Sequence, residues 1–230
     1  MEVLHPYAPA SLELPGYVPQ SRSRETILTL FFLFFAAPLM AFTWLLSGRA
    51  GAKLNPSDRL CMVWFAISGP IHLIIEGYFA LSSDLSQDTS GNLLADVWKE
   101  YSKCDSRYIM RDGFVVTMEA FTAFVEGPAC FFVVYLLALD HPKRWVWMIL
   151  TCFGQLYGDI LYFATEWYAG FTHGREDAVY FWFYFVIVNS AWIIFPALVI
   201  WYSWNSVNQL LMEGHRKAQG SMANGHSKVQ

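Results

Sequence analysis

The stretch TILTLFFLFFAAPLMAFTWLLSG, residues 26–48, contains no charged side chain. A helix needs about 20 mostly apolar residues to cross the hydrocarbon core of a bilayer, and this run is long enough. Four more long apolar runs follow, with at most two charged side chains each, at residues 60–83, 113–139, 145–165 and 178–212. The pattern predicts an all-α polytopic membrane protein built as a bundle of five transmembrane helices. A soluble protein with apolar core helices is disfavoured, because aromatic-rich runs of this length would expose too much apolar surface to water.

The segments that flank the five runs are polar. We expect residues 1–24 to form a polar N-terminal segment, residues 25–212 the five-helix membrane domain, and residues 213–230 a disordered tail. The first 24 residues have no basic start and no cleavage motif, so they do not resemble a signal peptide. The first helix is therefore expected to act as an uncleaved anchor.

Composition argues against several classes of protein. The net charge of −4, with no basic stripe, gives no reason to expect nucleic-acid binding. The four cysteines, Cys61, Cys104, Cys130 and Cys152, form no CxxC pair, so neither a disulfide framework nor a zinc site is expected. A di-iron site in a helix bundle needs Glu-x-x-His twice, whereas the predicted spans contain a single histidine, so no metal is expected.

Ionisable residues inside the predicted spans are the main functional signal. Such a side chain costs about 2.5–3.5 kcal/mol at the bilayer centre and is a functional-site hypothesis by default. His72 and Glu76 are four residues apart and share one helix face. Glu119 and Thr122 share a face of the third span. The ionisable residues well inside the spans are His72, Glu76, Glu119, Glu126 and Asp159.

The depths of these residues agree between helices. At 1.5 Å per residue, Glu76 and Glu119 lie roughly 10 and 9 Å from the membrane face nearer the N-terminus. His72 and Asn189 both lie roughly 16 Å from that face. Trp192 follows Asn189 on the same helix face one turn later. The counts predict a polar cavity inside the membrane, formed by several helices.

Each of these residues also has a structural interpretation. A buried His–Glu pair could simply tie two helices together. For Glu126 the structural and functional interpretations stay equally open, and Asp159 in GQLYGD suits helix packing. Proton chemistry explains the cluster better, because a buried carboxyl can keep a proton at neutral pH and a histidine can exchange it. Carboxyls and an indole face could also stabilise a cation.

Several motifs together resemble the emopamil-binding protein family, the sterol delta-8 to delta-7 isomerases. The likeness covers roughly residues 4–205 and includes the N-terminal LHPYAP and PGYVP. The motifs are SGPIHLIIEGYF (68–79), WKEYSKCDSRY (98–108), TMEAFTA (117–123), GQLYGDILYFATE (154–166) and YFWFYFVIVNSAWIIFP (180–196).

The resemblance implies a fold, an activity and a set of site residues. It implies a multi-pass protein of the endoplasmic reticulum membrane that moves the ring double bond of a delta-8 sterol without a cofactor. It also implies binding of cationic amphiphilic ligands. Cys104 stands where the family commonly has glycine. The catalytic residues it implies are His72, Glu76, Glu119, Asn189 and Trp192. The substrate-binding residues it implies are Thr122, Tyr101, Arg107, Tyr108 and Tyr184.

On this view His72 and Glu76 form one half of a proton-transfer device, and Glu119 forms the other half. The sequence does not decide which group is the acid and which the base, and it leaves a homodimer open. A non-catalytic sterol- or drug-binding relative is the rival class, and the full set of polar residues favours an enzyme. A proton-coupled transporter usually shows inverted repeats and broken helices, and we find neither pattern in the sequence.

Overall fold

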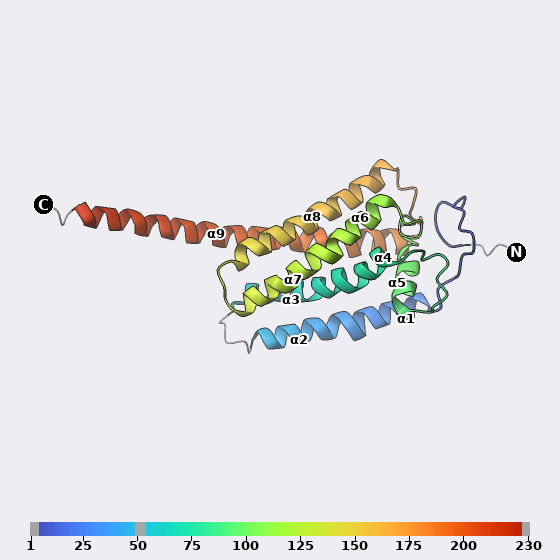
Figure 1. The fold of residues 1–230 in the computed structure, drawn as a ribbon, viewed down its shortest axis with the longest axis horizontal. Helices are drawn as coiled ribbons and strands as arrows, with labels where there is room; N and C mark the ends of the chain where they lie inside the picture. Colours follow the sequence, from blue (N-terminus) through green and yellow to red (C-terminus); the bar gives the residue numbers. More distant parts are fainter. Residues whose placement is uncertain (1–4, 49–53, 227–230) are drawn as a thin grey trace.

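The computed structural model describes residues 5–48 and 54–226, with side chains described through residue 220. Five helical rods in it are long and apolar enough to cross a membrane. They lie side by side, and the fifth projects well beyond the others toward the C-terminus (Figure 1). The predicted bundle of five membrane-spanning helices is confirmed. The rods are Arg24–Ser47, Pro56–Leu81, Gly113–Ala138, Arg144–Tyr168 and Val179–Gly220.

Four of the five rods combine α-helical and π-helical segments. The first two contain α1 (Arg24–Thr29), η1 (Leu30–Ala36) and α2 (Ala37–Ser47), then α3 (Pro56–Pro70), η2 (Ile71–Glu76) and α4 (Gly77–Leu81). The third contains α6 (Gly113–Phe121), η3 (Thr122–Glu126) and α7 (Gly127–Ala138). The fourth is α8 (Arg144–Tyr168), and the fifth contains η4 (Val179–Val188) and α9 (Asn189–His226). A short helix, α5 (Leu93–Tyr101), lies between the second and third rods.

The π-helical segments adjoin prolines in three of the rods, and in the second rod Pro70 directly precedes η2. Pro38 and Pro128 each stand at the start of an α-helix that directly follows a π-helical segment, η1 or η3. Proline has no N–H and its ring crowds the carbonyl four residues earlier, which in both cases belongs to the π-helical segment. The wider turn displaces that carbonyl, so the rod continues through the proline. π-helical turns are rare in proteins overall, but those that occur are often found at functional sites.

The second and third rods lie close together at Gly127. A Cβ atom added there would lie 3.1 Å from the backbone nitrogen of Leu73 and 3.4 Å from the carbonyl oxygen of Gly69. Small residues at such crossings let membrane helices approach backbone to backbone. This contact holds η2 beside η3, which carry the predicted site residues His72, Glu76 and Thr122.

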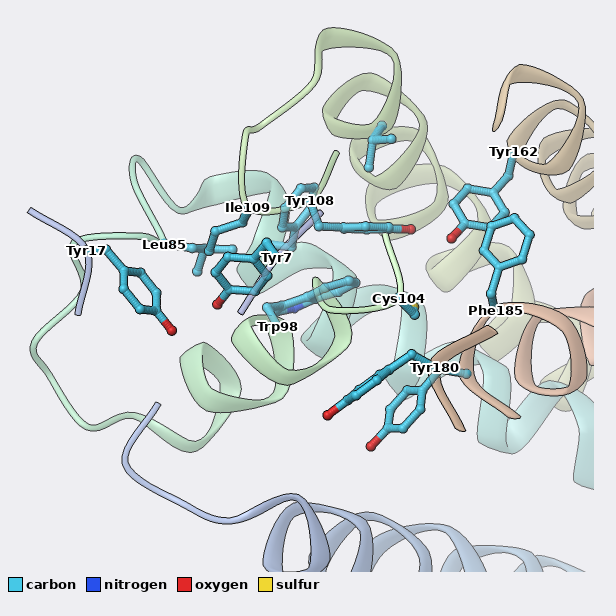
Figure 2. Packing of buried hydrophobic residues seen from close by; sticks show 13 residues of the cluster. Tyr7, Tyr17, Leu85, Trp98, Cys104, Tyr108, Ile109, Tyr162, Tyr180 and Phe185 are labelled. Atoms are coloured by element: carbon cyan, nitrogen blue, oxygen red, sulfur yellow. The ribbon is translucent and has the colours of Figure 1, made fainter. Parts of the chain in front are cut away.

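The N-terminal segment and α5 form a cap over one end of the bundle. Tyr7 and Tyr17 are buried against Leu85 and Trp98, which belong to the connection between the second and third rods (Figure 2). The backbone N–H of Ser21 donates a hydrogen bond of 2.8 Å to Asp96 of α5. We use "the cap" below for residues 5–23 and 82–112.

The C-terminal end of α9 differs from the expected disordered tail. The helix continues to His226, and its residues 213–220 are exposed. This stretch is rich in good helix formers such as Met, Glu, Arg, Lys, Ala and Gln, and its glycines cost only about 1 kcal/mol each in a helix. The domain boundaries after residues 24 and 212 stay predictions, and residues 227–230 of the expected tail lie outside the described range.

Replacing Gly127 by alanine tests the close contact of the second and third rods. We expect Gly127→Ala to lower stability by about 1–3 kcal/mol, because the new methyl group meets backbone that cannot move away freely. Gly158→Ala is the control, since nothing lies within 4 Å of its added Cβ. That variant should be more stable by about 0.5–1 kcal/mol, the usual gain from removing a helical glycine. Apparent melting temperatures in detergent compare the two, and equal shifts would contradict the close contact.

Candidate functional site

A cavity lies within the bundle next to the cap. Its free space, including the part that is open to the surroundings, is ≈ 890 Å³. It brings together residues from all five rods and from the cap. Eight of the ten predicted site residues line it: His72, Glu76, Tyr101, Tyr108, Glu119, Thr122, Asn189 and Trp192.

One wall of the cavity is a hydrogen-bonded chain that joins η2 to η3. The Nδ1 atom of His72 lies 2.7 Å from Oε2 of Glu76, as their spacing of four residues predicts. The hydroxyl of Thr122 donates a hydrogen bond to the same oxygen of Glu76. The His72 ring is buried, and its centroid lies 6.2 Å from that of Trp192. A carboxylate oxygen is therefore shared by two helices, next to an imidazole and an indole.

The facing carboxyl belongs to Glu119, at the end of α6. The hydroxyl of Tyr108 donates a hydrogen bond of 2.6 Å to its Oε1 atom. Burial raises the pKa of the Tyr108 hydroxyl well above its usual value, and the charge of Glu119 adds to the effect. Tyr108 therefore stays protonated and serves Glu119 as a donor. The residue comes from the cap, so the cap contributes directly to the site.

A second hydrogen bond from the cap fixes Asn189 at the start of α9. The Tyr101 hydroxyl donates to Oδ1 of Asn189 at 2.8 Å. The amide nitrogen of Asn189 donates to the backbone oxygens of Tyr184 and Phe185 at 3.2 and 2.8 Å. The orientation of the amide is thus set, with its oxygen toward Tyr101. Both carbonyls belong to η4, in the turn that precedes the start of α9.

Arg107 and Tyr184 do not line the cavity, although both were predicted as ligand-binding residues. The Arg107 guanidinium lies behind the wall, paired with Asp105 at 2.6 Å and donating to the hydroxyl of Thr165 at 2.7 Å. It also lies 4.9 Å from the centre of the Tyr162 ring, which does line the cavity. The nearby carboxylate holds Arg107 away from the cavity, because a buried charge needs its partner.

The side chain of Tyr184 is likewise turned away from the cavity. Its ring packs against the rings of Tyr180 and Tyr101, with centroids 5.3 and 6.5 Å away. What Tyr184 supplies to the site is its backbone carbonyl, which accepts from Asn189. Arg107 and Tyr184 therefore lie outside the cavity and contact residues that line it, Tyr162 and Asn189.

The cavity also includes polar residues that the sequence analysis left out of the site. Gln155 of α8 is buried, and its amide nitrogen lies 3.0 Å from Nε2 of His72. Glu126 and Asp159, whose roles were left open or judged structural, both line the cavity, and each has one buried oxygen without a hydrogen-bond partner. A sequence signal for Gln155 existed, since it lies four residues before Asp159 on the same helix face.

The electrostatic character of the cavity is acidic. Four carboxyl groups and one imidazole line it, and none of the lining residues in the described part of the chain is lysine or arginine. The described residues hold no group of three or more His, Cys, Asp or Glu placed to bind a metal ion. Their four cysteines are buried and unpaired. An apolar pocket with several carboxyls and an indole is suited to positive charge.

Comparison with known proteins identifies the family of this chain. Residues 93–203 match the EXPERA family, the expanded EBP superfamily. A 3-beta-hydroxysteroid-Delta(8),Delta(7)-isomerase of Mus musculus is 43% identical over 199 residues, which are 86% of each chain. This chain belongs to the EXPERA family. The resemblance of its motifs to the emopamil-binding protein family is thereby confirmed.

Other relatives of this chain are named either for the same isomerase activity or for a different reaction. A probable 3-beta-hydroxysteroid-Delta(8),Delta(7)-isomerase of Oryza sativa is 40% identical, covering 88% of this chain and 92% of the relative. A protoglabretal synthase of Ailanthus altissima is 35% identical, covering 89% of this chain and 92% of the relative. Relatives of similar length thus bear names for more than one reaction.

The cap depends on Glu100, the residue before Tyr101. Its carboxylate accepts hydrogen bonds from Gln20 at 2.7 Å, Lys103 at 2.6 Å and the hydroxyl of Tyr180 at 2.7 Å. Burial alone would raise the pKa of Glu100, but the donors Lys103, Tyr180 and Gln20 outweigh it and hold the pKa below its usual 4.5. The charged form therefore stabilises the fold, and joins the N-terminal segment, α5 and η4.

Glu100→Gln should destabilise the protein at neutral pH by about 1–3 kcal/mol, because the amide leaves a buried donor unpaired. A lowered pKa means that the stabilisation is present above pH 4.5 and is lost as the pH falls below it. Apparent melting temperatures of wild type and variant should therefore differ at pH 7 and converge on acidification. Glu13→Gln, at an exposed position, is the matched control. A difference that is independent of pH would contradict this role for Glu100.

Proposed function

We propose that this protein is a sterol isomerase that converts a delta-8 sterol into the delta-7 sterol. The observation that carries the proposal is the pair of facing carboxyls in one cavity, Glu76 joined to His72 and Thr122, and Glu119 joined to Tyr108. The names of the mouse and rice relatives describe the same conversion. The proposed setting is the endoplasmic reticulum membrane, and a homodimer stays a prediction.

The proposed reaction needs one proton donor and one proton acceptor. A proton added to C9 of the C8=C9 bond leaves a positive charge on C8. Loss of a proton from C7 then places the double bond between C7 and C8. One proton enters and one leaves, and no electrons are exchanged with a co-reactant. General acid–base catalysis by positioned side chains supplies about 10²–10⁴-fold per group.

Their different hydrogen bonds support different roles for the two carboxyls in this proposal. Oε2 of Glu76 accepts from Thr122 and lies against Nδ1 of His72, and donors of this kind favour a carboxylate that is ready to take a proton. Glu119 lines the same cavity as Glu76, and two carboxyls that share an apolar site favour a state in which one of them keeps a proton. In this proposal Glu119 is the acid that protonates C9, and Glu76 is the base that removes the proton from C7.

Trp192 and the acidic walls would stabilise the carbocation between the two steps. The indole contributes a π face, and the surrounding carboxyls contribute negative charge in a medium of low dielectric constant. Asn189, whose amide is held by the hydroxyl of Tyr101, would help to orient the carboxyl groups of the cavity. A cationic amphiphile resembles the intermediate in charge and shape, so the same cavity should bind tertiary-amine amphiphiles.

Isomerisation in deuterated water tests the proposal directly. The purified protein in lipid nanodiscs is given a delta-8 sterol and no added cofactor. We expect delta-7 product that carries one solvent deuterium at C9. Folded protein that yields neither product nor deuterium incorporation would exclude the isomerase and leave a sterol-binding protein.

Glu119→Gln should abolish most turnover while leaving the fold intact. The amide has nearly the same shape, but it cannot deliver the proton, so kcat should fall by about 10²–10⁴-fold. Asp159→Asn makes the same change at a carboxyl in the same cavity that lies outside the hydrogen-bonded pairs, and it should keep most activity. Turnover and melting temperature are measured together. Near-normal turnover of Glu119→Gln would remove this residue from the chemistry.

Trp192→Leu should weaken cationic ligands as well as slow turnover. The change keeps apolar bulk and removes the π face, which is worth about 0.5–2 kcal/mol for a bound cation. Trp201→Leu, at an exposed position of the same helix, is the control. The measurement is the Kd of a tertiary-amine amphiphile and of its neutral carbon analogue. An equal loss for both ligands would show that Trp192 acts by shape alone.

A further inference from the structure

Gln155 occupies a buried position between two aromatic residues of the second rod. Its amide oxygen accepts a hydrogen bond of 3.2 Å from the indole nitrogen of Trp64. Its amide nitrogen lies 3.0 Å from Nε2 of His72 and 3.7 Å from the sulfur of Cys130. Every polar group of the amide therefore has a partner, and a buried polar side chain with that many contacts has a fixed orientation.

Trp64 decides which way the amide of Gln155 points. The indole N–H can only donate, so the group that faces it must be the amide oxygen. The NH₂ group is then turned toward His72. Since an NH₂ group has no lone pair to offer, Nε2 of His72 must be the acceptor in that contact. A nitrogen that accepts carries no proton.

The ring proton of His72 is thereby placed on the opposite nitrogen. With Nε2 bare, the neutral ring carries its hydrogen on Nδ1, which lies 2.7 Å from Oε2 of Glu76. Nδ1–H therefore donates to Glu76, together with the hydroxyl of Thr122. The titratable groups near His72 are Glu76 on its own rod and Glu126 on the third rod.

We propose that Gln155 is a positioning residue that keeps His72 neutral, with its proton on Nδ1. Trp64 holds the amide in the orientation that does this. The consequence for catalysis rests on the proposed isomerase function. A neutral ring leaves Glu76 as a carboxylate with two donors and no full positive charge beside it. If the amide were absent or reversed, Nε2 could take a proton, and an imidazolium would pair with Glu76 and weaken it as a base.

The protonation of the ring can be observed without any assay of activity. The full chain is labelled with ¹⁵N-histidine and placed in nanodiscs at pH 7, and the signals of His72 are assigned by difference from His72→Gln. We expect a protonated Nδ1 and an unprotonated Nε2 in the wild type. A wild-type ring that carries a proton on Nε2, whether neutral or doubly protonated, overturns the proposal.

Two variants remove the constraint in different ways. Gln155→Leu deletes the donor, and Trp64→Phe keeps an aromatic ring but frees the amide to reverse. Both should yield a ring that is protonated on Nε2, with kcat lower by about 10- to 100-fold, as is usual when an orienting partner is removed. Phe195→Leu is the control, because Phe195 stacks on Trp64 at 4.9 Å and its loss leaves the indole N–H in place. That variant should keep the wild-type ring.

The two readouts separate this proposal from the proposed function. The expected ring signals with no isomerisation in any variant would leave the positioning role standing and exclude the isomerase. Wild-type ring signals in both Gln155→Leu and Trp64→Phe would show that Gln155 does not set the proton, even if activity fell. A merely structural role would lower the melting temperature without changing the protonated nitrogen.

Discussion

The hydrogen bond from Thr122 to Glu76 is the interaction on which the site depends. It joins η2 to η3, and these two segments carry His72, Glu76, Thr122 and Glu126. An unpaired carboxyl in a bilayer is costly, so the helices must approach closely enough to share it. Gly127 permits that approach because a side chain there would meet the backbone of Leu73. The close packing of the two rods and the need of Glu76 for a hydrogen-bond partner thus require the same geometry. The cavity forms beside this contact.

The cap supplies what the five rods cannot supply by themselves. Tyr108 and Tyr101 reach the cavity from outside the membrane spans and fix Glu119 and Asn189. Behind them, Asp105 and Arg107 form an ion pair that packs against Tyr162. A polar site in a membrane is rigid only if its donors are held from behind, and here the supporting pair is buried in the connection between the second and third rods.

Hydropathy was enough to predict the spans, and helix geometry indicated that several helices carry polar residues to one cavity. Uncharged runs identify membrane helices because hydrocarbon offers no partners to polar groups, and a rise of 1.5 Å per residue converts sequence position into depth. Arg107 and Tyr184 could not be placed in this way, because the direction of a side chain outside regular helix depends on its partners. Gln155 was missed because it is uncharged, and its role appears only when Trp64 and His72 lie on either side of it.

The position of the cap determines which measure of substrate concentration is relevant. The cap fills the N-terminal end of the bundle with packed tyrosine and tryptophan rings, so a sterol in this proposal comes from the surrounding lipid rather than from water (Figure 2). The quantity that sets the rate is then the mole fraction of substrate in the bilayer. Diluting a reaction with empty vesicles would slow it at constant total sterol, whereas diluting it with buffer would leave the rate per protein unchanged.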